Sequence, residues 1–143
     1  MFKHEIESIN RAKIVQLVNS KSCELDFSQT QKSVDSLVFL LEWLKNEPKS
    51  HGSQFSKDCI EQGVVTELLL NLHEDKHRCN LLRLPSLTSV RKVAIIRVIE
   101  LCAFSNKDYS MPYAWVKNGW TLFEDLKNNY LNLKRTGEYY VRS

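Results

Sequence analysis

A glycine between two apolar segments constrains the fold of this chain more than any other feature of its sequence. Residues 59–72 read CIEQGVVTELLLNL, and Gly63 separates a short apolar segment from a leucine-rich one. Glycine readily takes the left-handed conformation that ends many helices, because it has no Cβ atom. We therefore expect a helical hairpin over residues 55–77 with its corner at Gly63. The segment WVKNGWTLFEDL predicts a second corner at Gly119.

The composition favours a single helical domain. The chain has 143 residues, of which 43% are hydrophobic and 26% charged, as in ordinary globular proteins. Its four glycines and three prolines are too few for the frequent turns of an all-β fold. We expect one all-α domain over residues 1–143, made of five to seven antiparallel helices.

Apolar periodicity and capping residues place the individual helices. The pairs Ser28–Gln31 and Thr121–Glu124 have capping-box spacing, and Ser86, Thr88 or Ser89 can cap a helix over 90–104. That segment is apolar almost all round a helical wheel, which is typical of a central helix buried on several sides. Its many β-branched residues leave a buried strand as the alternative. The expected helices are 2–20, one from Ser28 that ends before Pro48, the two arms of the hairpin, 90–104, a short one from Pro112 to Lys117, and a last one from Thr121 that ends at Gly137.

Over residues 34–133 the chain resembles the armadillo and HEAT class of helical repeats. The hairpin of that class has two apolar residues, a polar pair, a glycine and two later leucines. The second unit departs from this pattern, because Glu124 and Asn128 stand at its two leucine positions. The resemblance implies stacked helices with an extended groove for peptides or proteins, whereas an irregular helical bundle is the alternative. The matching residues are Cys59, Ile60, Glu61, Gln62, Gly63, Leu68 and Leu72, followed by Ala94, Val98 and Leu101 of the neighbouring helix.

Charge and cysteine usage exclude several classes of protein. The net charge is only +3, and charged residues throughout Met1–Ser20 argue against a secretory signal. No apolar segment approaches the roughly 20 residues that cross a bilayer. The four cysteines are widely and irregularly spaced, without a CxxC pair. We therefore expect a cytoplasmic protein with reduced cysteines, no membrane span and no cofactor.

One short motif, HEDKH at residues 73–77, matches the zinc-protease pattern H-E-x-x-H. In that pattern His73 and His77 bind zinc, and Glu74 activates a water molecule. Two charged residues stand between Glu74 and His77, and the most evident downstream carboxylate, Glu100, belongs to the proposed core helix. We interpret the motif as a solvated polar helix end and predict no bound metal. A zinc-dependent hydrolase remains a third functional class.

The chain has one charge asymmetry, since no acidic residue occurs from Lys76 to Ile99. Basic side chains there suit an acidic protein surface or, as the alternative, nucleic-acid phosphates. Tryptophans near the second glycine either fill the core or anchor an interface. We predict a non-enzymatic protein-interaction module, such as an adaptor, inhibitor or immunity-type protein; a nucleic-acid-binding regulator is the alternative. The predicted partner-binding residues are Arg83, Arg91, Lys92, Arg97, Trp115 and Trp120.

Overall fold

The computed structural model describes residues 5–19, 24–45, 50–51, 54–55, 57–74, 79–105 and 110–136. Within these residues the fold is all-α, as predicted. The α-helices are α1 (Arg11–Asn19), α2 (Phe27–Leu44), α3 (Lys57–His73), α4 (Ser89–Phe104) and α5 (Gly119–Thr136). Two 3₁₀ helices, η1 (Leu81–Ser86) and η3 (Pro112–Trp115), and the short antiparallel strands β1 (Ser50–His51) and β2 (Gln54–Phe55) complete the described elements.

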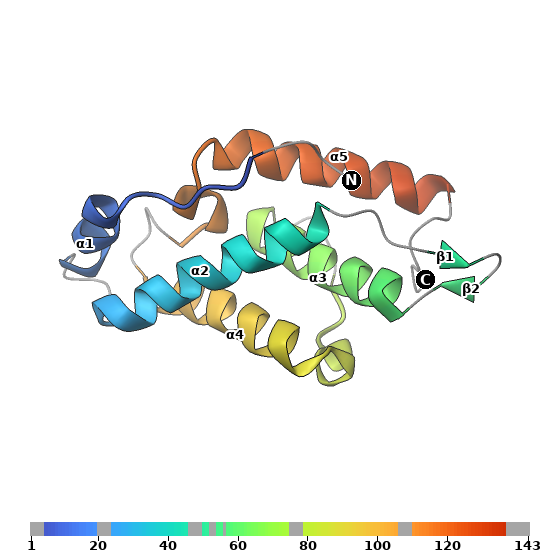
Figure 1. Ribbon diagram of the computed structural model, residues 1–143, viewed down its shortest axis with the longest axis horizontal. Helices are drawn as coiled ribbons and strands as arrows, with labels where there is room; N and C mark the ends of the chain where they lie inside the picture. Colours follow the sequence, from blue (N-terminus) through green and yellow to red (C-terminus); the bar gives the residue numbers. More distant parts are fainter. Residues whose placement is uncertain are drawn as a thin grey trace.

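The helices form a bundle in which α2 and α3 lie between α4 on one side and α5 on the other (Figure 1). Helix α2 packs most extensively against α4, and α3 contacts α2, α4 and α5. Helices α2 and α4 run in opposite directions (Figure 1). The backbone N–H of Glu24, just before α2, accordingly donates to the carbonyl of Phe104 at the end of α4, at 3.0 Å.

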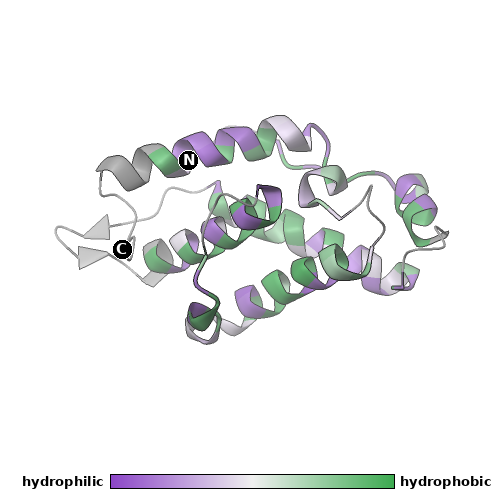
Figure 2. Ribbon diagram, turned by 180° about the vertical axis from the view of Figure 1, so that it is seen from behind, coloured by the Kyte–Doolittle hydropathy of each residue, from purple (hydrophilic) through white to green (hydrophobic). Residues whose placement is uncertain are grey.

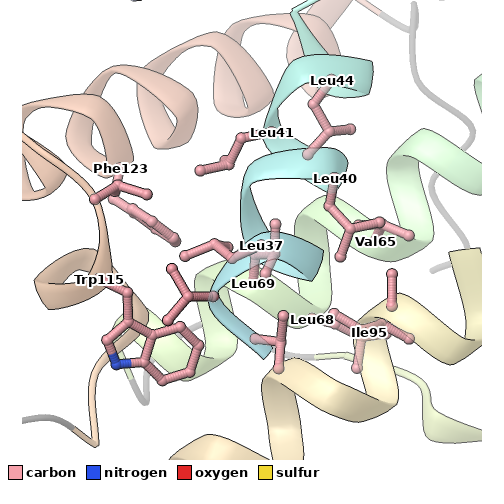
Figure 3. Close-up of a cluster of buried hydrophobic side chains, with 14 of the residues drawn as sticks. Leu37, Leu40, Leu41, Leu44, Val65, Leu68, Leu69, Ile95, Trp115 and Phe123 are labelled. Carbon is pink, nitrogen blue, oxygen red and sulfur yellow. The ribbon is translucent and has the colours of Figure 1, made fainter. Parts of the chain in front are cut away.

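Leucines dominate the core that these helices enclose (Figure 3). In α2 the buried leucines recur every three or four residues, so they share one face of the helix. Each fully buried side chain of this size contributes about 2 kcal/mol relative to an exposed one. The core shown in Figure 3 includes Leu37, Leu40, Leu41, Leu44, Val65, Leu68, Leu69, Ile95, Trp115 and Phe123. Among the described helices, none combines the length and apolar character needed to cross a bilayer.

The beginnings of the first two helices differ from the prediction. Helix α1 starts at Arg11, because the residues before it pair with the end of η3 and the residue after it: Ile9 N–H donates to the Trp115 carbonyl at 2.9 Å, and Ser8 forms an antiparallel bridge with Val116. Helix α2 has a capping box two residues earlier than predicted, at Asp26 and Gln29. Asp26 Oδ1 accepts the Gln29 N–H at 2.8 Å, and Gln29 Oε1 accepts the Asp26 N–H at 3.0 Å.

The predicted hairpin corner at Gly63 is wrong, because α3 is continuous from Lys57 to His73. Gly63 lies inside this helix and is buried. Its neighbours Glu61 and Gln62 are also buried, and Gln62 Nε2 donates to the Trp43 carbonyl at 3.2 Å. Packing on both sides of the glycine therefore keeps the segment helical, although glycine costs about 1 kcal/mol in a helix interior. The hairpin that partly supported the resemblance to armadillo and HEAT repeats is therefore not formed at Gly63. The rest of the resemblance stays a prediction.

A corner between a short helix and a longer one lies at the second glycine, as predicted, because η3 ends at Trp115 and α5 follows it. Gly119 begins α5, so Thr121 and Glu124 lie inside the helix and do not cap it. The positive φ of 53° belongs to Asn118, the residue before the helix. A Cβ atom on Gly119 would lie 1.7 Å from the Tyr113 carbonyl oxygen. Glycine is therefore required here for close approach of two backbones. The short helix before it, η3, ends at Trp115 and not at Lys117.

The segment 90–104 is helical, as predicted, and the strand alternative is wrong. However, α4 buries only one face, to which Ala94, Ile95, Val98 and Leu101 belong. Apolar residues on the other faces are exposed, which corrects the expectation of a helix buried on several sides. Thr88 is the N-cap residue, but its side chain makes no capping hydrogen bond.

Candidate functional site

A groove with a cavity volume of about 540 Å³ lies between α2 and α4. Residues three or four apart on a helix share a face, and both helices contribute such a row to the groove. The lining residues that matter most are Lys32, Asp35 and Phe39 from α2, and Val90, Val93 and Arg97 from α4.

Opposite helix directions give this groove two different ends. Residue numbers rise along α2 in the direction in which they fall along α4 (Figure 1). Lys32 and Arg97 therefore lie toward one end, and Phe39 and Val90 toward the other. The groove therefore has an apolar end and a charged end, which we call the basic end because its two cations, Lys32 and Arg97, outnumber its one lining carboxylate, Asp35.

Large apolar side chains in the groove are exposed. The exposed fractions are 42% for Phe39, 62% for Val90 and 46% for Val93. Hydrophobic residues recur along most of α4 (Figure 2), because they occupy both the core face and this outer face. The groove was not predicted from the sequence, although two patterns point to it. Phe39 lies off the core stripe of α2, and the sequence of α4 is apolar almost all round the helix. Both patterns indicate an apolar surface outside the core.

The four predicted basic residues do not share one face. Arg97 is exposed and lines the groove, whereas Arg91 donates to the Glu61 carboxylate at 2.6 Å inside the bundle. Lys92 and Arg97 are five residues apart, which separates them by about 140° around the helix axis. Arg83 is half-buried on the separate helix η1. Of these four residues, Arg97 therefore lines the groove, and the four do not form a continuous row of cations.

The two predicted tryptophans have different environments. Trp115 has an exposed fraction of 0% and belongs to the core (Figure 3), so its assignment to a partner surface is wrong. Trp120 is 52% exposed, and its ring lies 4.8 Å from that of His73. Trp120 therefore covers the end of α3 while keeping an outer face.

A second candidate site lies at that end of α3, where it meets α5. His73 is 2% exposed, so the interpretation of its surroundings as a solvated helix end is wrong. Its ring packs against Trp120 and against the Phe123 ring, whose centroid is 5.2 Å away, and meets Tyr113 edge-on at 5.8 Å. The carboxylate nearby is Glu124 of α5, at 3.7 Å from His73 Nε2, and not the expected Glu100. Residues 75–78, including His77, lie outside the described residues.

Charged groups around His73 form a compact cluster. Lys127 Nζ lies 3.1 Å from Glu74 Oε1 and also contacts the Glu124 carboxylate. These carboxylates raise the pKa of Lys127, first through the hydrogen bond to Glu124 and then through that to Glu74. Burial lowers the pKa of His73 below 6.5, against the opposing effect of Glu124 and Glu74. His73 is therefore neutral near pH 7, beside two carboxylates and one ammonium group.

Two cysteines in the described residues are free thiols, Cys79 and Cys102, and both are half-buried. Burial raises the pKa of Cys102 to about 12 and also raises that of Cys79. Both are therefore protonated near neutral pH, when a thiol is a weak nucleophile. Cys23 and the Cys59 side chain lie outside the described part.

Comparison of the chain with protein-family models, with curated proteins and with solved structures finds no match.

Proposed function

We propose that the protein is an interaction module whose α2–α4 groove binds an amphipathic helix of another protein. The observation that carries this proposal is the exposure of Phe39, Val90 and Val93 along one groove. The groove between two packed antiparallel helices can bind a third helix, which inserts side chains spaced three and four residues apart into the groove. The proposed role is non-enzymatic and requires no cofactor.

Burial of the apolar lining supplies the driving force. Phe39, Val90 and Val93 keep about half of their surface in water, and a bound helix would cover it. Each Å² of apolar surface removed from water contributes about 25 cal/mol, before the cost of association. The cavity volume of about 540 Å³ lies within the range of sites that hold several side chains.

The charges at the basic end indicate the orientation and chemistry of the partner. Lys32 and Arg97 lie there, and the one acidic lining residue, Asp35, already accepts a hydrogen bond from Gln31 Nε2 at 2.9 Å. A partner helix with Asp or Glu at one end of its apolar stripe would match this arrangement. Each such rim pair adds only about 0.2–1 kcal/mol, so its main effect is on orientation and specificity.

A displayed library of helical peptides, selected for binding to the full chain, tests the proposal. We expect enrichment of peptides with apolar residues at three- and four-residue spacing and an acidic residue toward one end. The enriched peptides should fail to bind Val93→Glu, which places a carboxylate in the groove. Arg97→Glu should lower the affinity for peptides that carry the acidic residue more than the affinity for the same peptides with glutamine at that position.

Leu131→Glu is the matched control, because Leu131 and Val93 have the same exposed fraction, 46%, and Leu131 lies on α5 away from the groove. Circular dichroism should show both variants folded. The proposal would be contradicted if the enriched peptides bound the unaltered chain, Val93→Glu and Leu131→Glu equally. It would also be contradicted if no amphipathic sequences were enriched.

A further inference from the structure

Three metal-ligating side chains from two helices meet at the end of α3. His73 is the last residue of α3, Glu74 follows it directly, and Glu124 comes from the second turn of α5. One ligand atom from each lies within 4.8 Å of the others, and His73 Nε2 is 3.7 Å from Glu124 Oε1. Imidazole nitrogen and carboxylate oxygen are both common ligands of zinc and related dications.

His73 provides a second, independent observation. Its side chain is buried, and neither ring nitrogen has a hydrogen-bond partner. A buried polar atom without a partner costs about 1–3 kcal/mol. The rings of Tyr113, Trp120 and Phe123 hold the imidazole in place, with Nε2 toward Glu124. The ring is therefore pre-positioned to donate its lone pair into the cluster.

Lys127 already supplies one positive charge at this position. Its ammonium group contacts both Glu74 and Glu124, so it neutralises part of the charge of the two carboxylates. A dication between the same carboxylates would neutralise both of them and would also engage His73. The lysine side chain is long and flexible, and it can move its ammonium group toward solvent.

We infer that His73, Glu74 and Glu124 form a binding site for a divalent transition-metal ion of the Zn²⁺ type, which Lys127 closes when no ion is bound. Zinc bonds to nitrogen and oxygen are about 2.0–2.2 Å long, which places tetrahedral ligands about 3.4 Å apart. The observed 3.7 Å between His73 Nε2 and Glu124 Oε1 is close to this separation. Three protein ligands leave a fourth position for water, as in open zinc sites. This inference is independent of the proposed function, because the groove lies between α2 and α4.

Calorimetric titration of the full chain, purified without a histidine tag, with zinc chloride tests this site. We expect one zinc ion per chain and a matching change in cobalt(II) absorption when Co²⁺ replaces Zn²⁺. Glu124→Gln should weaken zinc binding by about tenfold or more, because it replaces a charged ligand with a neutral one. Lys127→Met should strengthen it by about tenfold or more, because it removes a competing positive charge.

Glu67→Gln is the matched control. Glu67 also joins α3 to α5, through a 2.6 Å hydrogen bond from Tyr130 Oη, but it lies outside the cluster. Its substitution should leave zinc affinity unchanged. If Lys127→Met does not fold, the comparison of Glu124→Gln with Glu67→Gln still shows whether zinc binds at this cluster.

Three results would overturn the inference. The first is no zinc binding by the unaltered chain. The second is equal affinity in the unaltered chain, Glu124→Gln and Lys127→Met. The third is that His77→Gln abolishes zinc binding while Glu124→Gln leaves it unchanged, which would place the ion elsewhere.

Discussion

Arg91 and Glu61 form a buried ion pair that joins α4 to α3, with Arg91 Nη1 2.6 Å from Glu61 Oε2. The Glu61 side chain is 3% exposed, and its other oxygen accepts the backbone N–H of Thr88 at the start of α4. The Arg91 guanidinium also lies 4.1 Å from the centroid of the Trp43 ring, which brings in α2. A single cationic side chain therefore connects three helices of the bundle.

Arg91→Ala should lower the free energy of unfolding by about 3 kcal/mol, because it leaves a buried carboxylate without its cation. Urea unfolding measures this change as a lower midpoint at an unchanged m-value. Arg97→Ala on the exposed side of the same helix is the control, and its effect should stay within about 0.5 kcal/mol. Equal midpoints for the two variants would show that the ion pair adds no stability.

The two tryptophans predict opposite effects of substitution. Trp115→Ala should lower the free energy of unfolding by about 4 kcal/mol, because it leaves a cavity in the core. Trp120→Ala should cost about 1 kcal/mol or less, since the indole is half-exposed and its loss opens no enclosed cavity. Thermal and urea unfolding of both variants measure the difference. A larger effect at Trp120 than at Trp115 would contradict the burial described for these residues.

Helix positions could be predicted where the sequence signal is local. The core leucines of α2 and the apolar segment 90–104 repeat with helical spacing, and both segments are helical. The two glycines could not be interpreted in this way, because distant packing determines their conformation. Gly63 stays helical among buried neighbours of α3, and Gly119 is required by the backbone of Tyr113.

The candidate sites depend on contacts that no spacing in the sequence reveals. Phe39 and Val90 line one groove only because α2 and α4 run antiparallel and in contact. His73 and Glu124 are 3.7 Å apart across α3 and α5, although Glu124 matched a capping box in the sequence. Of the predicted partner-binding residues, Arg97 is the one that lines the groove. The sequence therefore indicated an excess of apolar surface on α4 but not what that surface faces.

Gly119→Ala should destabilise the junction between η3 and α5. The added Cβ atom would lie 1.7 Å from the Tyr113 carbonyl oxygen, so one of the two backbones must move. Forced overpacking of this kind costs about 1–3 kcal/mol, and a backbone clash belongs at the upper end. The free energy of urea unfolding measures the loss. Thr121→Ala is the control because Thr121 is exposed in the first turn of α5; a loss as large as that of Gly119→Ala would contradict the steric explanation.

His73 should make the stability of the protein depend on pH below neutrality. Its pKa is lowered in the folded state by burial, so below about 6.5 the unfolded chain binds a proton that the folded chain does not. The free energy of unfolding therefore falls as the pH decreases from 6.5 toward the native pKa of His73, by at most about 1.4 kcal/mol per pH unit. Above pH 6.5 His73 is neutral in both states and has no such effect.

Urea unfolding at pH 7.5, 6.5 and 5.5, in the presence of EDTA, measures this dependence. His73→Leu removes the titrating group while keeping an apolar side chain among Trp120 and Phe123, so the decrease in stability between pH 6.5 and 5.5 should be smaller in the variant. The ionisable groups other than His73 are the same in both proteins, so their contribution cancels in the comparison. Equal decreases in both proteins would show that His73 titrates in the folded chain as it does in the unfolded one, which would contradict the effect of its burial.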